Sequence, residues 1–218
     1  KGYKMKIAKS IDHTHLKPES PKNVYELLIS EANQYKFKAI CLPPSYVSFA
    51  KQRLDEEILV CTVISFPLGY QCLDVKKFET QKALKQGADE IDMVINISKL
   101  KMGRDREVLD EITTLKNLCE HKTLKVIVET AYLDRSELKK VCEIVAKSGA
   151  DFIKTSTGFA PSGAKLEDVQ FMREVLPKNV QIKASGGIKT YAQAKEMLNA
   201  GATRLGTSSG VTLVTSSD

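Results

Sequence analysis

The chain has 218 residues, of which 42% are hydrophobic and 28% charged, a composition typical of one globular domain with a sizeable core. No apolar run approaches the roughly 18 residues of a membrane span, so we expect no transmembrane segment. The net charge of +6 comes from lysines spread along the chain, which disfavours nucleic acid and membrane partners and leaves an anionic metabolite as a candidate ligand.

The compartment and redox state follow from the N-terminus and the cysteines. The first segment, KGYKMKIAKSIDHTHLKP, is basic but lacks the apolar core and small-residue cleavage site of a secretory signal, so we expect a cytoplasmic protein. Five cysteines without CxxC spacing argue against a disulfide framework and a structural zinc site. We expect free thiols at Cys41, Cys61, Cys72, Cys119 and Cys142.

Three segments share one layout, in which an amphipathic stretch is followed by Gly-Ala or Gly-Ala-Asp and a short apolar strand. They are GADEIDMVINI from Gly87, GADFIKTSTGF from Gly149 and GATRLGTSSG from Gly201. Glycine at this point fits a helix C-cap that turns directly into a strand. The layout predicts repeated helix, glycine, strand units.

Applied along the whole chain, this pattern predicts eight strands that alternate with helices from residues 21–36 onward. The strands are expected at Ser10 to Asp12, Ala39 to Cys41, Leu59 to Ile64, Glu90 to Ile95, Leu124 to Glu129, Phe152 to Lys154, Gln181 to Ala184 and Arg204 to Gly206. Eight such units predict a (β/α)8 TIM barrel in the α/β class. With no linker or low-complexity run, we expect residues 1–218 to form a single domain; an open doubly wound sheet is the alternative.

Charged side chains are expected inside this barrel. In EIDMV, Ile91 and Met93 share one face of the strand and Glu90 and Asp92 share the other, because residues two apart point the same way. If the apolar face packs on the helices, the charged face lies in the lumen, and the active site of such a barrel lies at the carboxyl ends of its strands. The residues predicted to converge there are Asp92, Glu129, Lys154 and Lys183.

Lys154 and Lys183 would be neighbours on strands six and seven. Two ammonium groups held close in a partly dry site repel, so we expect the pKa of at least one of them to be lowered toward neutrality. A neutral amine is a nucleophile toward carbonyl groups, as Schiff-base catalysis requires. The alternative is a structural role, in which both lysines pair with carboxylates to fill a polar lumen.

Small and hydroxyl-bearing residues after strands six, seven and eight suggest a phosphate site. Gly186 and Gly187 let the backbone approach a ligand, and the helix that begins near Thr190 would aim unpaired N–H groups at it. The other candidate donors lie in STGF (156–159) and at Ser208 and Ser209. Loops after strands seven and eight often bind phosphate in these barrels, although each segment alone is also typical of a plain turn.

A metal site at the end of strand one is the competing hypothesis. His13 and His15 are spaced as in the His-x-His pair of metal-dependent amidohydrolases, which carry such a pair at this place. That chemistry needs further histidines after later strands, and the remaining histidine, His121, precedes strand five. We therefore expect no metal here, a structural role for both histidines, and Asp12 near the site.

Six segments together resemble the deoxyribose-phosphate aldolase family of class I aldolases. They are IDHTHLKP, TVISFPLG, GADEIDMVINI, VIVETAYL, GADFIKTSTGF and IKASGGIKT, and the match runs from Ile11 to about Ser209. The resemblance implies that Lys154 forms the Schiff base, that Lys183 is the second lysine, and that Asp92 is the acid/base. It also implies phosphate contacts by Thr157, Gly158, Gly186, Gly187, Ser208 and Ser209, and places Cys41 beside the site.

The implied reaction is the reversible cleavage of 2-deoxy-D-ribose 5-phosphate to acetaldehyde and D-glyceraldehyde 3-phosphate, in deoxyribose phosphate catabolism, without a cofactor. The implied partners are small phosphorylated sugars and aldehydes, and a second copy of the chain, because homo-dimers occur in the family. The chain departs from some members at Phe159, where they carry lysine, and in its tail VTLVTSSD, which lacks their tyrosine. The alternatives are a transaldolase-like Schiff-base enzyme and a non-catalytic phosphosugar-binding barrel.

Overall fold

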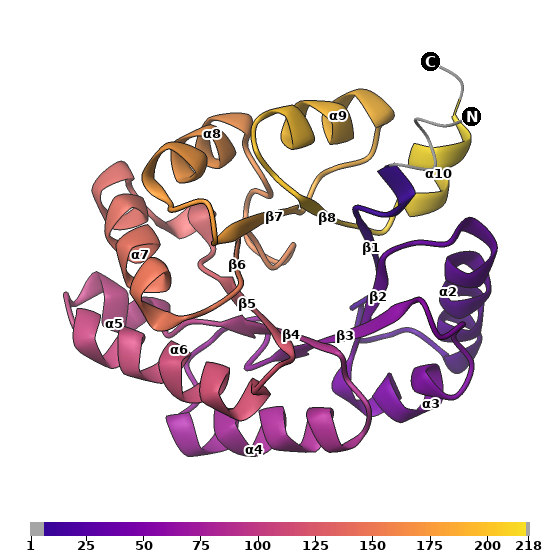
Figure 1. Cartoon of the computed structure of the whole chain (residues 1–218), viewed down its shortest axis with the longest axis horizontal. Coiled ribbons are helices and arrows are strands. Elements are labelled where there is room, and N and C mark those ends of the chain that lie inside the picture. The colour runs from indigo at the N-terminus through magenta and orange to yellow at the C-terminus, as the bar shows by residue number, and fades with distance from the viewer. Residues whose placement is uncertain (1–6, 217–218) are drawn as a thin grey trace.

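Eight parallel strands close into a barrel in the order of the sequence, each paired with its neighbours and β1 paired with β8 (Figure 1). The computed structural model describes residues 7–216; the first part of the basic N-terminal segment and the last two residues of the tail lie outside them. The strands are β1 (Ile11–Thr14), β2 (Ala39–Leu42), β3 (Leu59–Ile64), β4 (Glu90–Val94), β5 (Thr123–Ile127), β6 (Phe152–Lys154), β7 (Gln181–Ser185) and β8 (Arg204–Thr207). The predicted TIM barrel is confirmed, and every predicted strand end lies within two residues of the observed one.

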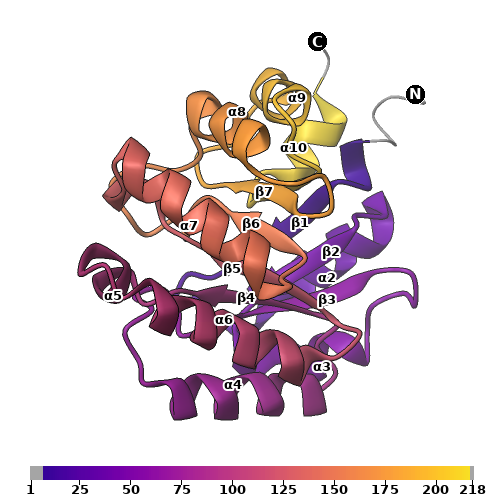
Figure 2. The same cartoon turned by 60° about the vertical axis from the view of Figure 1, so that its left-hand side comes forward.

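Helices surround this barrel on its outer face, as both views show (Figures 1 and 2). They are α2 (Lys22–Tyr35), α3 (Val47–Lys51), α4 (Leu73–Lys85), α5 (Ile97–Lys101), α6 (Asp105–Cys119), α7 (Arg135–Ser148), α8 (Leu166–Val175), α9 (Tyr191–Asn199) and α10 (Gly210–Thr215), with short 3-10 turns η1 (Pro44–Tyr46) and η2 (Thr130–Tyr132). None of the helices within residues 7–216 has the length and apolar character needed to cross a membrane.

Helix α7 shows how the repeated layout works. It begins at a capping box, in which Asp134 accepts from the backbone N–H of Glu137 and the Glu137 side chain accepts from the N–H of Asp134. It ends at Gly149, whose φ of 81° is left-handed and which leads directly toward β6. The predicted glycine C-cap is therefore confirmed here.

Strand alternation separates the apolar core from a charged lumen. Ile91 and Met93 are fully buried in the main hydrophobic cluster, where the strands meet the helices, and each such side chain contributes about 1.5–3 kcal/mol by leaving water. Glu90 and Asp92, on the opposite face of β4, are equally buried but belong to an ionic cluster. The sheet therefore presents its charges inward, as predicted.

The aspartates of the Gly-Ala-Asp segments fix strand positions at the amino end of the barrel. Asp89 accepts from the backbone N–H of Val60 at 3.0 Å and from Lys51 Nζ at 2.7 Å. Asp151 accepts in the same way from the N–H of Leu124, at 2.8 Å. These bonds tie each strand to the preceding one and so set the register of the residues at the other end.

Candidate active site

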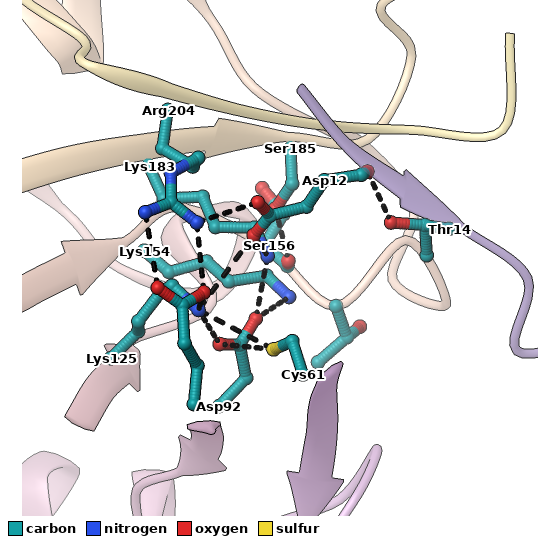
Figure 3. A network of polar contacts seen from close by, with 12 residues as sticks. Asp12, Thr14, Cys61, Asp92, Lys125, Lys154, Ser156, Lys183, Ser185 and Arg204 are labelled. Atoms are coloured by element: carbon teal, nitrogen blue, oxygen red, sulfur yellow. Dashed lines mark hydrogen bonds and ion pairs between the residues drawn. The ribbon is translucent and has the colours of Figure 1, made fainter. Parts of the chain in front are cut away.

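A buried ionic cluster fills the lumen of the barrel (Figure 3). Its seven charged members come from six strands, and each is at most 6% exposed. They are Asp12 on β1, Glu90 and Asp92 on β4, Lys125 on β5, Lys154 on β6, Lys183 on β7 and Arg204 on β8. Because burial of unpaired charges is costly, these groups persist only through the contacts they make with one another.

Asp92 lies at the centre of the cluster, and its two oxygens have different partners. Oδ2 is 2.8 Å from the Nζ atoms of both Lys154 and Lys183. Oδ1 is 2.9 Å from Lys125 Nζ and 3.1 Å from Cys61 Sγ. Burial raises the pKa of Asp92, but the three lysines outweigh burial and hold it well below its usual value. Asp92 is therefore a carboxylate shared by three ammonium groups.

Beneath Asp92, Asp12 and Glu90 bind the remaining cations. Arg204 donates to Asp12 at 2.7 Å and to the two oxygens of Glu90 at 2.8 and 3.0 Å. Lys125 is 2.6 Å from Glu90, and Lys183 is 2.5 Å from Asp12. The cluster thus contains four cationic side chains and three carboxylates, which leaves one positive charge uncompensated when every group is ionised.

The predicted proximity of Lys154 and Lys183 is confirmed, because they are paired residues on adjacent strands. Lys183 is not a lysine whose pKa is lowered. Burial lowers the pKa of Lys183, but the carboxylates of Asp12 and Asp92 outweigh burial and hold it well above its usual value. Asp12, which repulsion between the two lysines leaves out of account, is a direct partner of Lys183.

Lys154 is the member of the cluster that borders open space. A cavity of about 280 Å³ lies above it, lined by residues from β6, β7, β8 and the segment after β1. Three lysines line this cavity, namely Lys17, Lys154 and Lys189, and no acidic residue lines it within the described part of the chain. Such a cavity favours an anionic ligand positioned close to the Lys154 amine.

Most of the predicted phosphate-binding residues lie on the cavity wall: Thr157, Gly158, Gly186, Gly187 and Ser208. Ser209 does not; it precedes α10, and its N–H donates to Thr207 Oγ1 at 2.9 Å. The expected unpaired N–H groups at the helix near Thr190 are also wrong in part. Thr190 and Gln193 form a capping box that satisfies donors in the first turn of α9, so the glycine loop, and not the helix end, faces the cavity.

Contrary to the prediction, Glu129 forms no ion pair with Lys154 or Lys183 among the described residues, although the charge of Lys154 acts to lower its pKa. β5 ends at Ile127, and Glu129 adopts a left-handed conformation with φ of 55°. Its carboxylate accepts from the N–H of Thr157 at 3.2 Å and from the Thr157 hydroxyl. Burial raises the pKa of Glu129 despite these bonds. Lys125 lies four residues before Glu129 and shares its face in the strand alternation. It is Lys125 that lies in the lumen, among the carboxylates.

The two histidines near the end of β1, His13 within the strand and His15 just after it, make hydrogen bonds, as expected. His13 Nε2 lies 2.6 Å from Glu31 Oε2, and His15 Nε2 lies 2.5 Å from Ser20 Oγ. His15 and Thr14 also line the cavity. Asp12 lies deeper, in contact with Lys183, which agrees with its expected position near the site.

Two groups of side chains have metal-ligand chemistry. The donor atoms of Cys41, Cys61 and Asp92 lie within 4.8 Å of one another, and so do those of Asp12, Cys61 and Glu90. All the carboxylates in both sets are already in contact with ammonium or guanidinium groups, which a cation would have to displace. Cys41 lies in the lumen beside Cys61, and its hydrogen bond to Cys61 lowers the pKa of its thiol.

The whole chain is similar to known aldolases. The family model described as DeoC/LacD family aldolase matches residues 6–213. The chain is 53% identical to the deoxyribose-phosphate aldolase of Metamycoplasma hominis over 90% of this chain and 91% of that one. It is 49% identical to deoxyribose-phosphate aldolase 1 of Staphylococcus aureus (strain MRSA252), over 96% of each. Among solved structures, the tetrameric deoxyribose phosphate aldolase of Aeropyrum pernix superposes with a TM-score of 0.90 at 33% identity, over 98% of this chain and 92% of that one.

Proposed function

The chain belongs to the DeoC/LacD family of aldolases, and from this membership we propose that it reversibly cleaves 2-deoxy-D-ribose 5-phosphate to acetaldehyde and D-glyceraldehyde 3-phosphate. Two relatives of about 50% identity carry the name of that activity over nearly the full length of the chain. The observation that supports a Schiff-base mechanism is the position of Lys154, whose Nζ lies 2.8 Å from Asp92 at the base of an acid-free cavity.

In the proposed mechanism, written in the direction of synthesis, Lys154 acts as a neutral amine. Its nitrogen adds to the carbonyl carbon of acetaldehyde, and the resulting carbinolamine loses water to give an imine. Removal of a proton from the adjacent methyl group converts the imine into an enamine. The enamine carbon attacks the aldehyde of glyceraldehyde 3-phosphate, and water then hydrolyses the new imine and returns the free amine.

Asp92 and Lys183 are the proposed proton-transfer groups. Asp92 Oδ2 contacts both lysine nitrogens at 2.8 Å, so a proton released at Lys154 has an acceptor within hydrogen-bond distance. The proton of Lys183 is stabilised by Asp12 and Asp92, so this lysine stays cationic, repels a second proton on Lys154 and can donate to a departing oxygen.

The phosphate is proposed to bind at the opposite wall of the cavity. Gly186, Gly187 and Ser208 bring backbone and hydroxyl donors there, and the ammonium groups of Lys17 and Lys189 add positive charge. Within the described residues no acidic side chain lines the cavity beside these two lysines. Binding the phosphate away from the reacting carbon would orient the aldehyde for attack.

The wider role is also a proposal. We infer that the reaction belongs to the catabolism of deoxyribose phosphate in the cytoplasm, where the adjacent lumen thiols of Cys41 and Cys61 would stay reduced. We also infer self-association; the homologue from Aeropyrum pernix is a tetramer. A homodimer, which the resemblance implies, is the smallest assembly that would meet this proposal.

A donor comparison tests the proposed substrate. The protein is incubated with 2-deoxyribose 5-phosphate or with fructose 6-phosphate, and released acetaldehyde and glyceraldehyde 3-phosphate are measured by coupled reduction. The proposal expects both products from deoxyribose 5-phosphate and no glyceraldehyde 3-phosphate from fructose 6-phosphate in the presence of erythrose 4-phosphate. Transfer from fructose 6-phosphate would favour the transaldolase-like alternative, and binding without products would favour the binding barrel.

A further inference from the structure

Two partners of Asp92, Lys125 and Cys61, have no role in the mechanism above, and Lys125 is the charged one of the two. Lys125 Nζ lies 2.9 Å from Asp92 Oδ1, on the side of the carboxylate opposite to the oxygen that Lys154 and Lys183 share (Figure 3). We propose that Lys125 is a positioning residue, whose ammonium group fixes the orientation of Asp92 and supplies the positive charge that favours the neutral amine of Lys154. This inference rests on the proposed Schiff-base function.

Lys125 cannot touch substrate in this arrangement. Its side chain is fully buried, and it does not line the cavity. Its Nζ is also 2.6 Å from Glu90, 3.3 Å from Cys61 Sγ and 3.7 Å from Asp12. These contacts come from three different strands, so the ammonium group has one well-defined position. It therefore acts on the reaction only through its effect on Asp92 and on the charge of the cluster.

The effect on Asp92 is geometric. A carboxylate held at one oxygen only can rotate about its side-chain bonds, and the Oδ2 atom would then leave the point between Lys154 and Lys183. Donors on both oxygens remove that freedom, because Lys125 and Cys61 hold Oδ1 while the two cavity-side lysines hold Oδ2. Preorganised groups of this kind cost no reorganisation during the reaction.

The effect on Lys154 is electrostatic. The seven-residue cluster has four cations and three carboxylates, so one positive charge has no carboxylate of its own. Glu129 is the other buried carboxyl that acts on Lys154, but it is bonded to Thr157 and burial raises its pKa. Lys125 and Lys183 are enclosed, and Lys154 alone of the three borders the cavity, where a proton can leave. Without Lys125 the cluster would hold three cations and three carboxylates, and a charged Lys154 would be fully compensated.

The test is the pH dependence of imine trapping in Lys125→Met. Each carboxylate keeps a cation in this variant, because Glu90 retains Arg204 and Asp92 retains Lys154 and Lys183, so the barrel is expected to fold. The rate of reductive trapping of acetaldehyde by cyanoborohydride, which survives mild acid, is measured from pH 5 to pH 9. We expect the half-plateau pH to rise by about one unit, which is roughly a tenfold slower rate near neutral pH, with the plateau still reached in alkali.

Two variants separate this role from simple stabilisation. Lys125→Arg keeps the charge and is expected to keep the wild-type midpoint. Lys76→Met removes another fully buried lysine, which pairs with Glu111 at 2.7 Å between α4 and α6 and outside the lumen; it is expected to lower stability without moving the midpoint.

An unchanged midpoint in folded Lys125→Met, or an equal shift in Lys125→Arg, would overturn the role proposed for Lys125. Should Lys125→Met not fold, Lys125→Gln serves as the neutral variant with the same expectation. If the wild-type protein itself traps no aldehyde, the Schiff-base function fails, and that result is distinct from a failure of the Lys125 proposal.

Discussion

At the scale of single residues, the site depends on the unequal surroundings of similar side chains. Lys125 and Lys183 are enclosed by carboxylates, which raise the pKa of each well above its usual value. Lys154 has one carboxylate contact, to Asp92, and borders the cavity. Three lysines on adjacent strands thus have different chemistry because of burial and the number of their anionic partners.

Strand alternation was enough to place Asp92, Lys154 and Lys183 inside the barrel. Glu129 was misplaced because it lies beyond the end of β5 and its own backbone is left-handed, so strand alternation no longer applies to its side chain. No sequence pattern signals that change of backbone conformation. Lys125 could have been found, since it shares the inward face of β5, but alternation alone does not say which inward residue reaches the site. Arg204 and Glu90 also lie on the inward faces of their strands, where alternation places them.

Glu129 is predicted to hold the wall of the cavity at Thr157. Glu129→Ala removes both bonds to Thr157 and should raise the KM for deoxyribose 5-phosphate roughly tenfold, because hydrogen bonds to a carboxylate contribute about 1.5–3 kcal/mol. Steady-state kinetics checks this value. Glu129→Gln keeps an acceptor of the same shape and should stay within threefold of wild type; equal losses in both variants would assign the effect to the carboxylate charge instead of the bonds.

At the scale of elements, the loops after β6 and β7 form one unit. The N–H of Ala164 donates to the carbonyl oxygens of Ser185 and Gly186, both at 3.0 Å, and Ser185 Oγ donates to the carbonyl of Ser156 at 2.7 Å. The strands and helices of this region were predictable from periodicity and glycine C-caps. The contacts between the two loops were not, because they join residues more than 20 positions apart and each ends on a backbone carbonyl, which carries no sequence signal.

Gly163 tests this coupling between loops. A Cβ atom at this position would lie 2.2 Å from the carbonyl oxygen of Gly186, so Gly163→Ala should displace the glycine loop and raise the KM for deoxyribose 5-phosphate by roughly tenfold, with a smaller change for non-phosphorylated deoxyribose. Gly103→Ala is the control, because nothing lies within 4 Å of its Cβ. It should cost about 1–2 kcal/mol of stability, because an alanine would have to adopt the left-handed φ of Gly103, and it should leave KM unchanged. An unchanged KM in Gly163→Ala would show that the two loops are not coupled.

At the scale of the whole molecule, a polar lumen is combined with an apolar layer between strands and helices. The period-two pattern of the strands and the repeated helix, glycine, strand layout made the barrel predictable. The charges inside it add a dependence on pH that composition does not reveal. Asp12 and Asp92 both have lowered pKa values in the folded protein, because neighbouring cations outweigh burial.

The free energy of unfolding is therefore predicted to fall in acid. A carboxylate whose pKa is lowered by folding contributes stability above its unfolded pKa, near 3.8 for aspartate, and loses it as pH falls toward the folded value. Glu129, with a raised pKa, acts in the opposite direction and more weakly. Urea unfolding from pH 7 to pH 3 should show a loss of stability that begins below about pH 5.

Asp12→Asn should lower the free energy of unfolding by about 3–5 kcal/mol at pH 7, since it leaves Arg204 and Lys183 with one carboxylate fewer. The same variant should flatten the loss of stability in acid. A wild-type slope in Asp12→Asn would show that other carboxylates control the acid transition.

The central claim is that Lys154 forms an imine with the aldehyde substrate. The most direct measurement is peptide mass spectrometry after incubation with acetaldehyde and borohydride, with Lys154→Met as the control. We predict a reduced two-carbon adduct on Lys154 that is absent from the variant, while circular dichroism shows the same fold in both. An adduct on another lysine, or a folded wild-type protein without any adduct, would contradict the claim.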